Sequence, residues 1–411
     1  MKQANFTKLL LAMILLICNV GVHAQWTISE TPSSYHLYGI DAVTNDVIYA
    51  GGYGGSLVKS IDGGETWNAL SIGSFDWVKS IHFFNADNGW IITSNDMGDG
   101  GDVLKTTDGG VTWTSSHSGY AYSDMHWIDD QICYVSTWQG VLVKTTNAGV
   151  SWVVLPTPYL DVNVYSIQFF DEDNGFALNT DYKLLRTDDG GATWTNTYHA
   201  GLLNFFFITP TTGFCVNDYG EIGKTTDGGL TYEYVSTDFE GIKFNDIEFL
   251  TEDFGYAIGG LDCRDGSCLQ SPVLLSTKNG GETWESNAHP LEGQLRGFYE
   301  LSFAPNGTPF IAGSNKMVLK NTSFVGLPET DEVQYINAFP NPSNGVFTFN
   351  FSSSVEKIKI RNILGEVVEI IETNHQHTIQ ISLFDYSAGL YLVEFQNQHG
   401  TVVGNSKVQL N

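Results

Sequence analysis

A short motif recurs six times at intervals of about forty residues, and this repetition limits the folds open to the chain. The copies are SIDGGETW (60–67), TTDGGVTW (106–113), TTNAGVSW (145–152), TDDGGATW (187–194), TTDGGLTY (225–232) and STKNGGETW (276–284). Their final aromatic residues lie 46, 39, 42, 38 and 52 residues apart. A repeat of this length indicates that each unit is one supersecondary structure, which buries its apolar face only against its neighbours.

Each repeat unit contains enough sequence for four short strands. Three runs with alternating apolar residues precede the motif, and the third commonly ends in a basic residue before Ser or Thr, as in VKS, LKT, VKT, LRT and GKT. The fourth strand begins with the aromatic residue of the motif. Four strands in about 43 residues is the size of one blade of a β-propeller. The repeat therefore predicts an all-β fold of the propeller type.

The motif itself has the composition of a tight turn. An Asp or Asn side chain can accept hydrogen bonds within its own turn, while the glycines that follow adopt positive φ. These residues resemble the Asp-box, or BNR repeat, with the pattern Ser-x-Asp-x-Gly-x-Thr-Trp; Tyr232 replaces the Trp in the fifth copy. The resemblance implies a structural role for the acidic or amide residue of each copy, which is Asp62, Asp108, Asn147, Asp189, Asp227 or Asn279.

Two fragments outside the six repeats predict a seventh blade. Residues 296–320 repeat the first three strands but lack the motif and the outer strand. Residues 25–28, near the start of the chain, look like an orphan outer strand. Joining the two fragments closes a seven-bladed β-propeller over 25–324, a span of 300 residues that agrees with seven units. Such a ring leaves no open end at which another sheet edge could pair.

The two ends of the chain have other patterns. Residues 1–24 are predicted to be a signal peptide, with Lys2 and Lys8 before a short apolar run and a small-residue cleavage pattern that ends at Ala24. No later stretch is apolar enough to span a membrane, so we expect an exported protein without membrane insertion. Residues 325–335 form a polar, acidic linker.

Residues 336–411 are predicted to form a small antiparallel β-sandwich, because alternating strands follow a Pro-Asn-Pro turn. They resemble the C-terminal sorting domain of type IX secretion in Bacteroidetes, through residues 340–345, residues 362–365, Gly389 to Tyr391, and Lys407. The resemblance implies that the type IX secretion machinery of the outer membrane recognises residues 336–411, which are then removed. The protein is then released or attached at the cell surface.

The charge balance excludes several kinds of partner. The chain has 46 acidic and 19 basic side chains, with a formal net charge of -27. Binding to nucleic acid or to anionic lipid requires a basic surface, which this composition does not supply. We therefore expect no nucleic-acid partner.

Other Asp-box families differ from this chain in specific residues. Sialidases clamp a carboxylate with three arginines, but the propeller here has only Arg186, Arg264 and Arg296, and Arg186 occupies the position of the strand lysine in other repeats. Xyloglucanases have two propellers, and this chain has room for one. The closer resemblance is to the single seven-bladed propeller of photosystem II assembly factors. Because the arginine patch of that family is missing, the resemblance implies the fold and not the ligand.

Aromatic residues recur on the face that would bind a ligand. In a propeller, the turns between second and third strands lie opposite the Asp-box turns. Four such turns carry an aromatic residue at a matching position: Tyr53, Trp138, Tyr182 and Tyr219. These rings could stack on sugar faces or hold a peptide. Ordinary packing over the strand ends is the alternative.

One column of the innermost strands is mostly polar and predicts the wall of a central channel. It contains Asp41, His82, His126, Gln168, Phe206, Glu248 and Ser302. His82 and His126 fall on adjacent blades, so they could act as a metal-binding or acid–base pair. The alternative is that these residues bind channel water.

Two long loops are further candidates. Cys263 and Cys268 are predicted to form a local disulfide in an oxidising compartment, with metal binding as a weaker alternative. The loop at 95–102 is rich in oxygen ligands and is a weak calcium candidate through Asp96, Asp99 and Asp102, although a solvated acidic loop is the favoured interpretation.

These patterns favour a secreted or cell-surface, non-catalytic binding or adhesion module for glycan or protein, without a cofactor. The alternative is an extracellular glycoside hydrolase, which needs two carboxylates about 5–10 Å apart. Glu248 with Asp41 is the pair that the sequence offers for that chemistry.

Overall fold

The computed structural model describes residues 26–95, 97–155, 162–197, 201–217, 219–237, 239, 242–260, 271–294, 296–322, 334–336, 338–339, 343, 345–350, 355–362, 367–373, 378–384, 386–396 and 402–410. The predicted signal peptide (1–24), Asp96, the Cys263–Cys268 pair and most of the predicted linker lie outside these residues. The chain divides into two compact units, residues 1–324 and 325–411. Among the described residues, no helix has the length and apolar character needed to cross a membrane.

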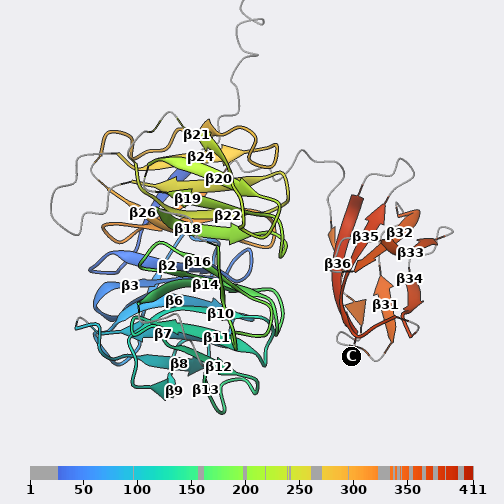
Figure 1. The fold of residues 1–411 in the computed structure, drawn as a ribbon, viewed down its shortest axis with the longest axis horizontal. Helices are drawn as coiled ribbons and strands as arrows, with labels where there is room; N and C mark the ends of the chain where they lie inside the picture. Colours follow the sequence, from blue (N-terminus) through green and yellow to red (C-terminus); the bar gives the residue numbers. More distant parts are fainter. Residues whose placement is uncertain are drawn as a thin grey trace, which may run out of the picture. The chain divides into compact units, whose positions relative to one another are not determined.

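Seven four-stranded antiparallel sheets make up the described part of the first unit (Figure 1). The first comprises β2 (Leu37–Ala42), β3 (Ile48–Gly52), β4 (Ser56–Ser60) and β5 (Asn68–Ser71). The second comprises β6 (Trp77–Phe83), β7 (Gly89–Ser94), β8 (Asp102–Thr106) and β9 (Thr114–Ser118). The third comprises β10 (Tyr122–Trp127), β11 (Cys133–Thr137), β12 (Leu142–Thr145) and β13 (Val153–Leu155).

The remaining four sheets follow the same plan. The fourth comprises β14 (Val164–Phe169), β15 (Gly175–Asn179), β16 (Leu184–Thr187) and β17 (Thr195–Thr197). The fifth comprises β18 (Leu202–Phe207), β19 (Gly213–Asn217), β20 (Glu221–Thr225) and β21 (Glu233–Ser236). The sixth comprises β22 (Phe244–Phe249), β23 (Gly255–Gly259), β24 (Val273–Thr277) and β25 (Glu285–Ser286). The seventh comprises β26 (Phe298–Phe303), β27 (Pro309–Gly313), β28 (Met317–Asn321) and β1 (Trp26–Glu30).

The innermost strands of these sheets contact one another in a cycle. Strand β2 contacts β6, and the contacts continue through β10, β14, β18 and β22 to β26, which contacts β2 again. Strands β2 and β26 are neighbours although 255 residues of the chain lie between them. This cyclic arrangement of sheets is that of a propeller, and the all-β prediction is confirmed.

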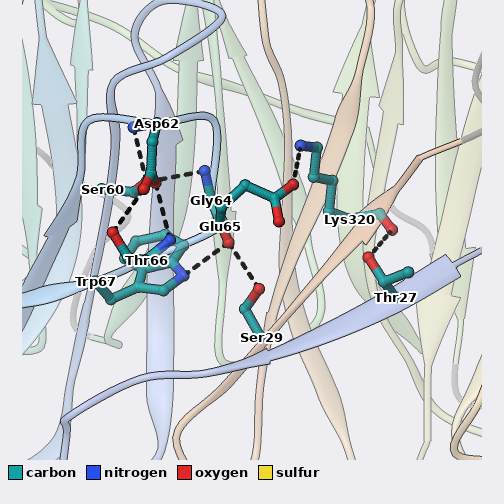
Figure 2. Close-up of polar contacts among 9 residues, drawn as sticks. All are labelled: Thr27, Ser29, Ser60, Asp62, Gly64, Glu65, Thr66, Trp67 and Lys320. Carbon is teal, nitrogen blue, oxygen red and sulfur yellow. Dashed lines mark hydrogen bonds and ion pairs between the residues drawn. The ribbon is translucent and has the colours of Figure 1, made fainter.

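The N-terminal strand β1 completes the seventh sheet. It pairs antiparallel with β28, from Trp26 opposite Asn321 to Glu30 opposite Met317. The Ser29 hydroxyl also donates to the Gly64 carbonyl in the Asp-box of the first sheet, at 2.6 Å (Figure 2). The pairing expected for the orphan strand is therefore present, and it ties the seventh sheet to the first.

Aromatic rings fill the space between neighbouring sheets. A ring from the second strand of one sheet stacks on a ring from the first strand of the next, with near-parallel planes. The pairs are Tyr49–Phe83 at 3.6 Å, Tyr134–Phe169 at 3.6 Å, Phe176–Phe207 at 3.8 Å and Phe214–Phe249 at 3.9 Å between centroids. The Asp-box tryptophan then meets the same layer edge-on, as Trp113 does against Phe83 at 84°. Of the six large aromatics that end the repeats, Trp67 and Trp194 are buried, and the other four are partly buried and pack against the core. Full burial of such a ring contributes about 1.5–3 kcal/mol.

A basic residue precedes five of the six Asp-boxes, and in the first and fifth it also links two sheets. The Lys59 ammonium lies 5.0 Å from the Tyr49 ring centroid and donates to the backbone carbonyls of Ala86 and Gly109 in the second sheet. Lys224 repeats this contact by donating to the Gly280 carbonyl at 2.7 Å. Arg186 occupies the same place over Phe176, which agrees with its structural assignment from the sequence.

The second unit contains two sheets that share one core. One has the order β29 (Gln334–Tyr335), β36 (Val402–Leu410), β35 (Gly389–Gln396), β32 (Lys357–Asn362) and β33 (Val367–Glu372). The other has the order β30 (Ala338–Phe339), β31 (Val346–Asn350) and β34 (Thr378–Ser382). Phe347, Phe349 and Phe395 are buried in the core between them. The described strand pairs of this unit are antiparallel, as expected, except that β29 pairs parallel to β36; an isolated parallel bridge also joins Ser343 to Leu410.

Candidate functional site

Every innermost strand of the first unit has a β-bulge at the same place. The register shifts between Leu37 and Gly39 in β2, and the same shift recurs in β6, β10, β14, β18, β22 and β26. A bulge adds one residue to a strand and changes which side chains share a face. Counting from the buried residue that precedes the bulge, such as Leu37, positions two to five lie along the central cavity, and in most of these strands positions two, three and five are the partly exposed ones.

The central cavity has a volume of about 500 Å³ and is lined by all seven innermost strands. The predicted column from Asp41 to Ser302 is position five and lies in its wall. Position three supplies three further carboxyl groups that sequence reasoning missed: Asp124, Asp246 and Glu300. In a regular strand, residues two apart share a face, so position five predicts that position three also faces the cavity. Position two is on the opposite face in a regular strand, and only the bulge turns its side chain into the cavity.

Most of the polar side chains in the channel bond to the backbone of the next sheet. Each innermost strand is a sheet edge, so its outward N–H groups need acceptors. Side-chain oxygens accept these bonds in the pairs Asp41–Phe83 (2.6 Å), Asp124–Ile167 (2.9 Å), Gln168–Phe207 (2.8 Å), Asp246–Leu301 (2.8 Å), Glu300–Ile40 (3.2 Å) and Ser302–Ala42 (3.1 Å). The last two pairs join the seventh sheet to the first. These residues therefore hold the ring together.

Burial changes the proton affinity of the channel groups. It raises the pKa of Asp41 and Asp124 to about 7 and that of Asp246 to about 6. It lowers the pKa of His82 and His126 to about 4, so both imidazoles are neutral at pH 7. Across the described residues, no three His, Cys, Asp or Glu side chains are grouped so that they could hold a metal ion.

The raised carboxyl pKa values give an expected pH dependence of stability. Asp124 keeps its proton in the folded state up to about pH 7, whereas the unfolded chain loses it near pH 4. This contribution is full below pH 4 and is lost as the pH rises from 4 to 7, so this one carboxyl group should lower the free energy of unfolding by about 1 kcal/mol per pH unit between pH 5 and 6.5. The buried histidines act in the opposite direction over this range, because they are neutral in the folded state and protonated in the unfolded chain. Urea unfolding of the wild type and of Asp124→Asn at pH 5, 5.75 and 6.5 isolates the carboxyl contribution, because the histidines affect both proteins alike; the free energy of unfolding of the wild type should fall relative to that of the variant, and equal slopes would contradict the assignment.

Glu248 differs from the other channel carboxyl groups. Its Oε2 atom is buried and has no hydrogen-bond partner in the structure. Burial, with the nearby charges of Asp246 and Asp41, holds its pKa well above the ordinary value. A buried carboxyl oxygen without a donor is unfavourable unless a ligand or a proton satisfies it.

An aromatic cluster lies beside the end of the channel where the innermost strands begin, and its members Tyr38 and Tyr299 line the cavity. We call it the aromatic mouth and define it as Tyr35, Tyr38, Tyr53, Trp77 and Tyr299. Successive centroids lie 5.0 Å apart for Tyr35–Tyr53, 4.7 Å for Tyr53–Trp77, 5.7 Å for Trp77–Tyr38 and 4.8 Å for Tyr38–Tyr299. These rings come from the first, second and seventh sheets or from the loops that lead into them. They form one continuous apolar and aromatic surface.

Two of the four predicted rim aromatics belong to this region. Tyr53 is part of the mouth, and Trp138 approaches it through Lys79, whose ammonium lies 4.2 Å from the Trp77 centroid and 5.9 Å from that of Trp138. Tyr182 and Tyr219 are 45% and 64% exposed and have no ring contact with the mouth among the described residues. Sequence reasoning missed Tyr38 and Tyr299 because both occupy position two, which the bulge turns into the channel.

The Asp-boxes form closed turns (Figure 2). The Asp62 carboxylate accepts bonds from the Thr66 amide (2.8 Å), the Thr66 hydroxyl (2.6 Å) and the Ser60 hydroxyl (2.8 Å). The Trp67 indole donates to the Gly64 carbonyl at 3.2 Å. The Thr66 bonds are the main reason that the pKa of Asp62 is lowered to about 2. The carboxylates of Asp108, Asp189 and Asp227 have the same partners in their own turns.

In the third and sixth Asp-boxes an Asn replaces the Asp, and one hydrogen bond of the turn runs in the opposite direction. The Asn147 side-chain oxygen accepts the Ser151 amide at 2.9 Å, while its NH₂ group donates to the Ser151 hydroxyl. Asn279 does the same with Thr283. The hydroxyl is a donor to Asp and an acceptor from Asn, so both residues close the turn. This explains why Asn is tolerated in the third and sixth copies.

The described part of the weak calcium candidate is occupied by local hydrogen bonds. Asp99 accepts a bond from the Asn95 amide group at 2.8 Å, and Asp102 accepts one from the Ser115 hydroxyl at 2.6 Å. The two carboxylates therefore have separate partners. Cys133 and Cys215 are buried free cysteines in the cores between neighbouring sheets.

The C-terminal unit matches a known family. Residues 337–409 match the secretion system C-terminal sorting domain. This unit is a sorting domain. Its presence shows that the protein is directed to export, and it confirms the resemblance drawn from the sequence for nearly the same residues. Comparison of the chain with curated proteins yields no match.

Several solved structures are similar to this chain in fold. YCF48 from Cyanidioschyzon merolae is 19% identical, with a TM-score of 0.61 over 72% of this chain and 99% of that one. YCF48 bound to D1 peptide is also 19% identical, with a TM-score of 0.60 over 72% and 96%. The GH74 xyloglucanase from Xanthomonas campestris is 11% identical, with a TM-score of 0.56 over 94% and 74%. At these identities the likeness shows the fold alone.

Proposed function

We propose that the protein is a secreted or cell-surface seven-bladed propeller that binds a glycan or protein ligand at the aromatic mouth without catalysing a reaction. The sorting domain would direct it through type IX secretion and then be removed. The observation that carries the binding role is the continuous group of five rings beside one end of the channel. Aromatic faces stack on sugar rings and pack against peptide side chains, so such a surface suits either ligand.

The alternative hydrolase function has weaker support. A glycosidase needs one carboxylic acid and one carboxylate that are free to reach the sugar. Asp41, however, accepts a bond from the Phe83 amide, as Gln168 and Ser302 do from backbone amides at the same strand position. Of the pair that the sequence offers, only Glu248 therefore keeps an oxygen without a hydrogen-bond partner. The GH74 likeness supports only a shared fold. Hydrolysis of polysaccharides by the purified protein, lost in Glu248→Gln, would nevertheless establish the alternative.

The binding role predicts a specific effect of Trp77. Trp77→Ala should weaken binding of the ligand about three- to tenfold, because one stacked aromatic contact contributes about 0.5–1.5 kcal/mol. Ligands would first be found on a glycan array and by pull-down with surface proteins, and affinity would then be measured by calorimetry. Tyr219→Ala is the matched control, since it removes an exposed ring outside the mouth. Equal affinities of wild type and Trp77→Ala would contradict the assignment of the mouth as the binding surface.

A further inference from the structure

Four of the five carboxyl side chains in the described channel wall lie on one side of it, which we call the acidic side, and the fifth, Asp124, lies on β10 with His126. Asp246 and Glu248 lie on β22, Glu300 on β26 and Asp41 on β2, which belong to three successive sheets. His82 and His126 lie on β6 and β10 and carry no charge at pH 7. Lys79 is the one basic side chain in the described cavity wall, and its ammonium lies over Trp77 on the side of the second sheet.

Within the acidic side, one oxygen is left without a donor. Asp41, Asp246 and Glu300 each accept a backbone N–H from the neighbouring sheet. The Glu248 Oε2 atom has no such partner, although it is buried in the cavity wall. A ligand that donates hydrogen bonds and carries positive charge would satisfy this oxygen and reduce the repulsion among the carboxyl groups.

The aromatic mouth leads to the acidic side. Tyr299 immediately precedes Glu300 on β26, and its ring lies 4.8 Å from that of Tyr38 on β2. Glu248 lies at position five, three residues further along its strand than the mouth positions, which is about 10 Å. An extended basic side chain can cover much of this distance and present several donors at its end. The existing contact of Lys79 with Trp77 shows that rings of the mouth already accept a cation on their faces.

We propose that the mouth binds a polypeptide by taking one of its arginine or lysine side chains into the channel, where the cation meets Glu248. This inference rests on the proposed binding role of the mouth and names the chemistry of its ligand. A divalent metal is a poorer occupant, because the described residues offer no cluster of three ligands. A neutral sugar would leave the repulsion among the carboxyl groups unchanged.

The experiment compares two capped amino acids of nearly identical shape. N-acetyl-arginine amide is cationic, and N-acetyl-citrulline amide is its neutral counterpart. Titrated into the full-length secreted protein and followed by tryptophan fluorescence and calorimetry, the arginine compound should bind at least about tenfold more tightly, since a hydrogen bond to a charged group contributes about 1.5–3 kcal/mol. Glu248→Gln should weaken binding of the arginine compound by about tenfold. Glu252→Gln, which removes an exposed acid from the loop that follows β22, should leave binding unchanged.

Three results would overturn the inference: no binding of the arginine compound at millimolar concentration, equal binding of the citrulline compound, or equal binding in Glu248→Gln. Thermal unfolding of Glu248→Gln shows whether the variant is folded, and Glu248→Asp, which keeps the acid but shortens its reach, gives an intermediate loss if the inference holds. If a glycan binds in a manner that depends on Trp77 but not on Glu248, the proposed binding function stands while the cation inference fails.

Discussion

The variant Trp26→Ala is expected to lower the free energy of unfolding of the propeller by about 3–5 kcal/mol. The Trp26 side chain is 4% exposed and packs edge-to-face on Tyr256 at 5.7 Å, in the core between the sixth and seventh sheets. Deletion of residues 26–30 should be more damaging still. It would remove the whole of β1, expose the edge of β28 and break the bond from Ser29 to Gly64. A closed ring depends on every contact between neighbouring sheets, so opening one contact affects the whole.

Thermal unfolding of the mature chain tests this expectation. For a domain of this size, Trp26→Ala should lower the melting temperature by about 5–10 °C. Trp26→Phe is the matched control, because it keeps a large ring and removes an indole N–H that has no acceptor in the structure. It should cost far less than Trp26→Ala. A melting temperature unchanged by deletion of 26–30 would show that the first and seventh sheets are not joined by β1.

Deletion of residues 336–411 is expected to abolish export of the propeller. The sorting domain is a separate compact unit with its own core, and its family match extends over 337–409. Removing it leaves the propeller without a signal for the outer-membrane step, so the protein should accumulate inside the cell envelope. Immunoblotting of medium, surface and periplasmic fractions from a bacterium with type IX secretion measures the distribution.

A fusion protein tests whether the sorting domain is sufficient for export. Residues 325–411 fused behind a periplasmic reporter protein should carry that reporter out of the cell. A variant of the fusion with Phe395→Asp, which places a charge at a fully buried core position, should fail to export it. Normal amounts of the truncated propeller in the medium would show that export does not require the sorting domain.

The propeller fold could be predicted because it depends on patterns of residues that are close together in the sequence. Each Asp-box closes its turn with bonds between residues no more than four apart, such as Ser60, Asp62 and Thr66, so its meaning does not depend on distant parts of the chain. The incomplete repeat at 296–320 and the strand near Trp26 predicted their own pairing, because each lacked what the other had. The sorting domain was likewise recognisable from short segments of sequence.

The site was less predictable. The channel column that contains Asp41 and Glu248 was identified, because polar residues recur at one strand position. The mouth was not, since Tyr38 and Tyr299 face the channel only through a bulge, and a bulge leaves no mark in the alternation of polar and apolar residues. Of the predicted rim, Tyr53 joins the mouth, whereas Tyr182 and Tyr219 do not contact it among the described residues.

The sequence by itself determined the repeat, the turn chemistry, the partner strands at the two termini and the sorting domain, because these depend on local spacing and residue type. The tertiary structure alone decided which rings meet at the mouth and which carboxyl oxygen is left without a donor. Both outcomes depend on ring closure, which brings Tyr299 beside Tyr38 and supplies the Ile40 amide to Glu300 across some 260 residues of chain, but offers no donor to Glu248.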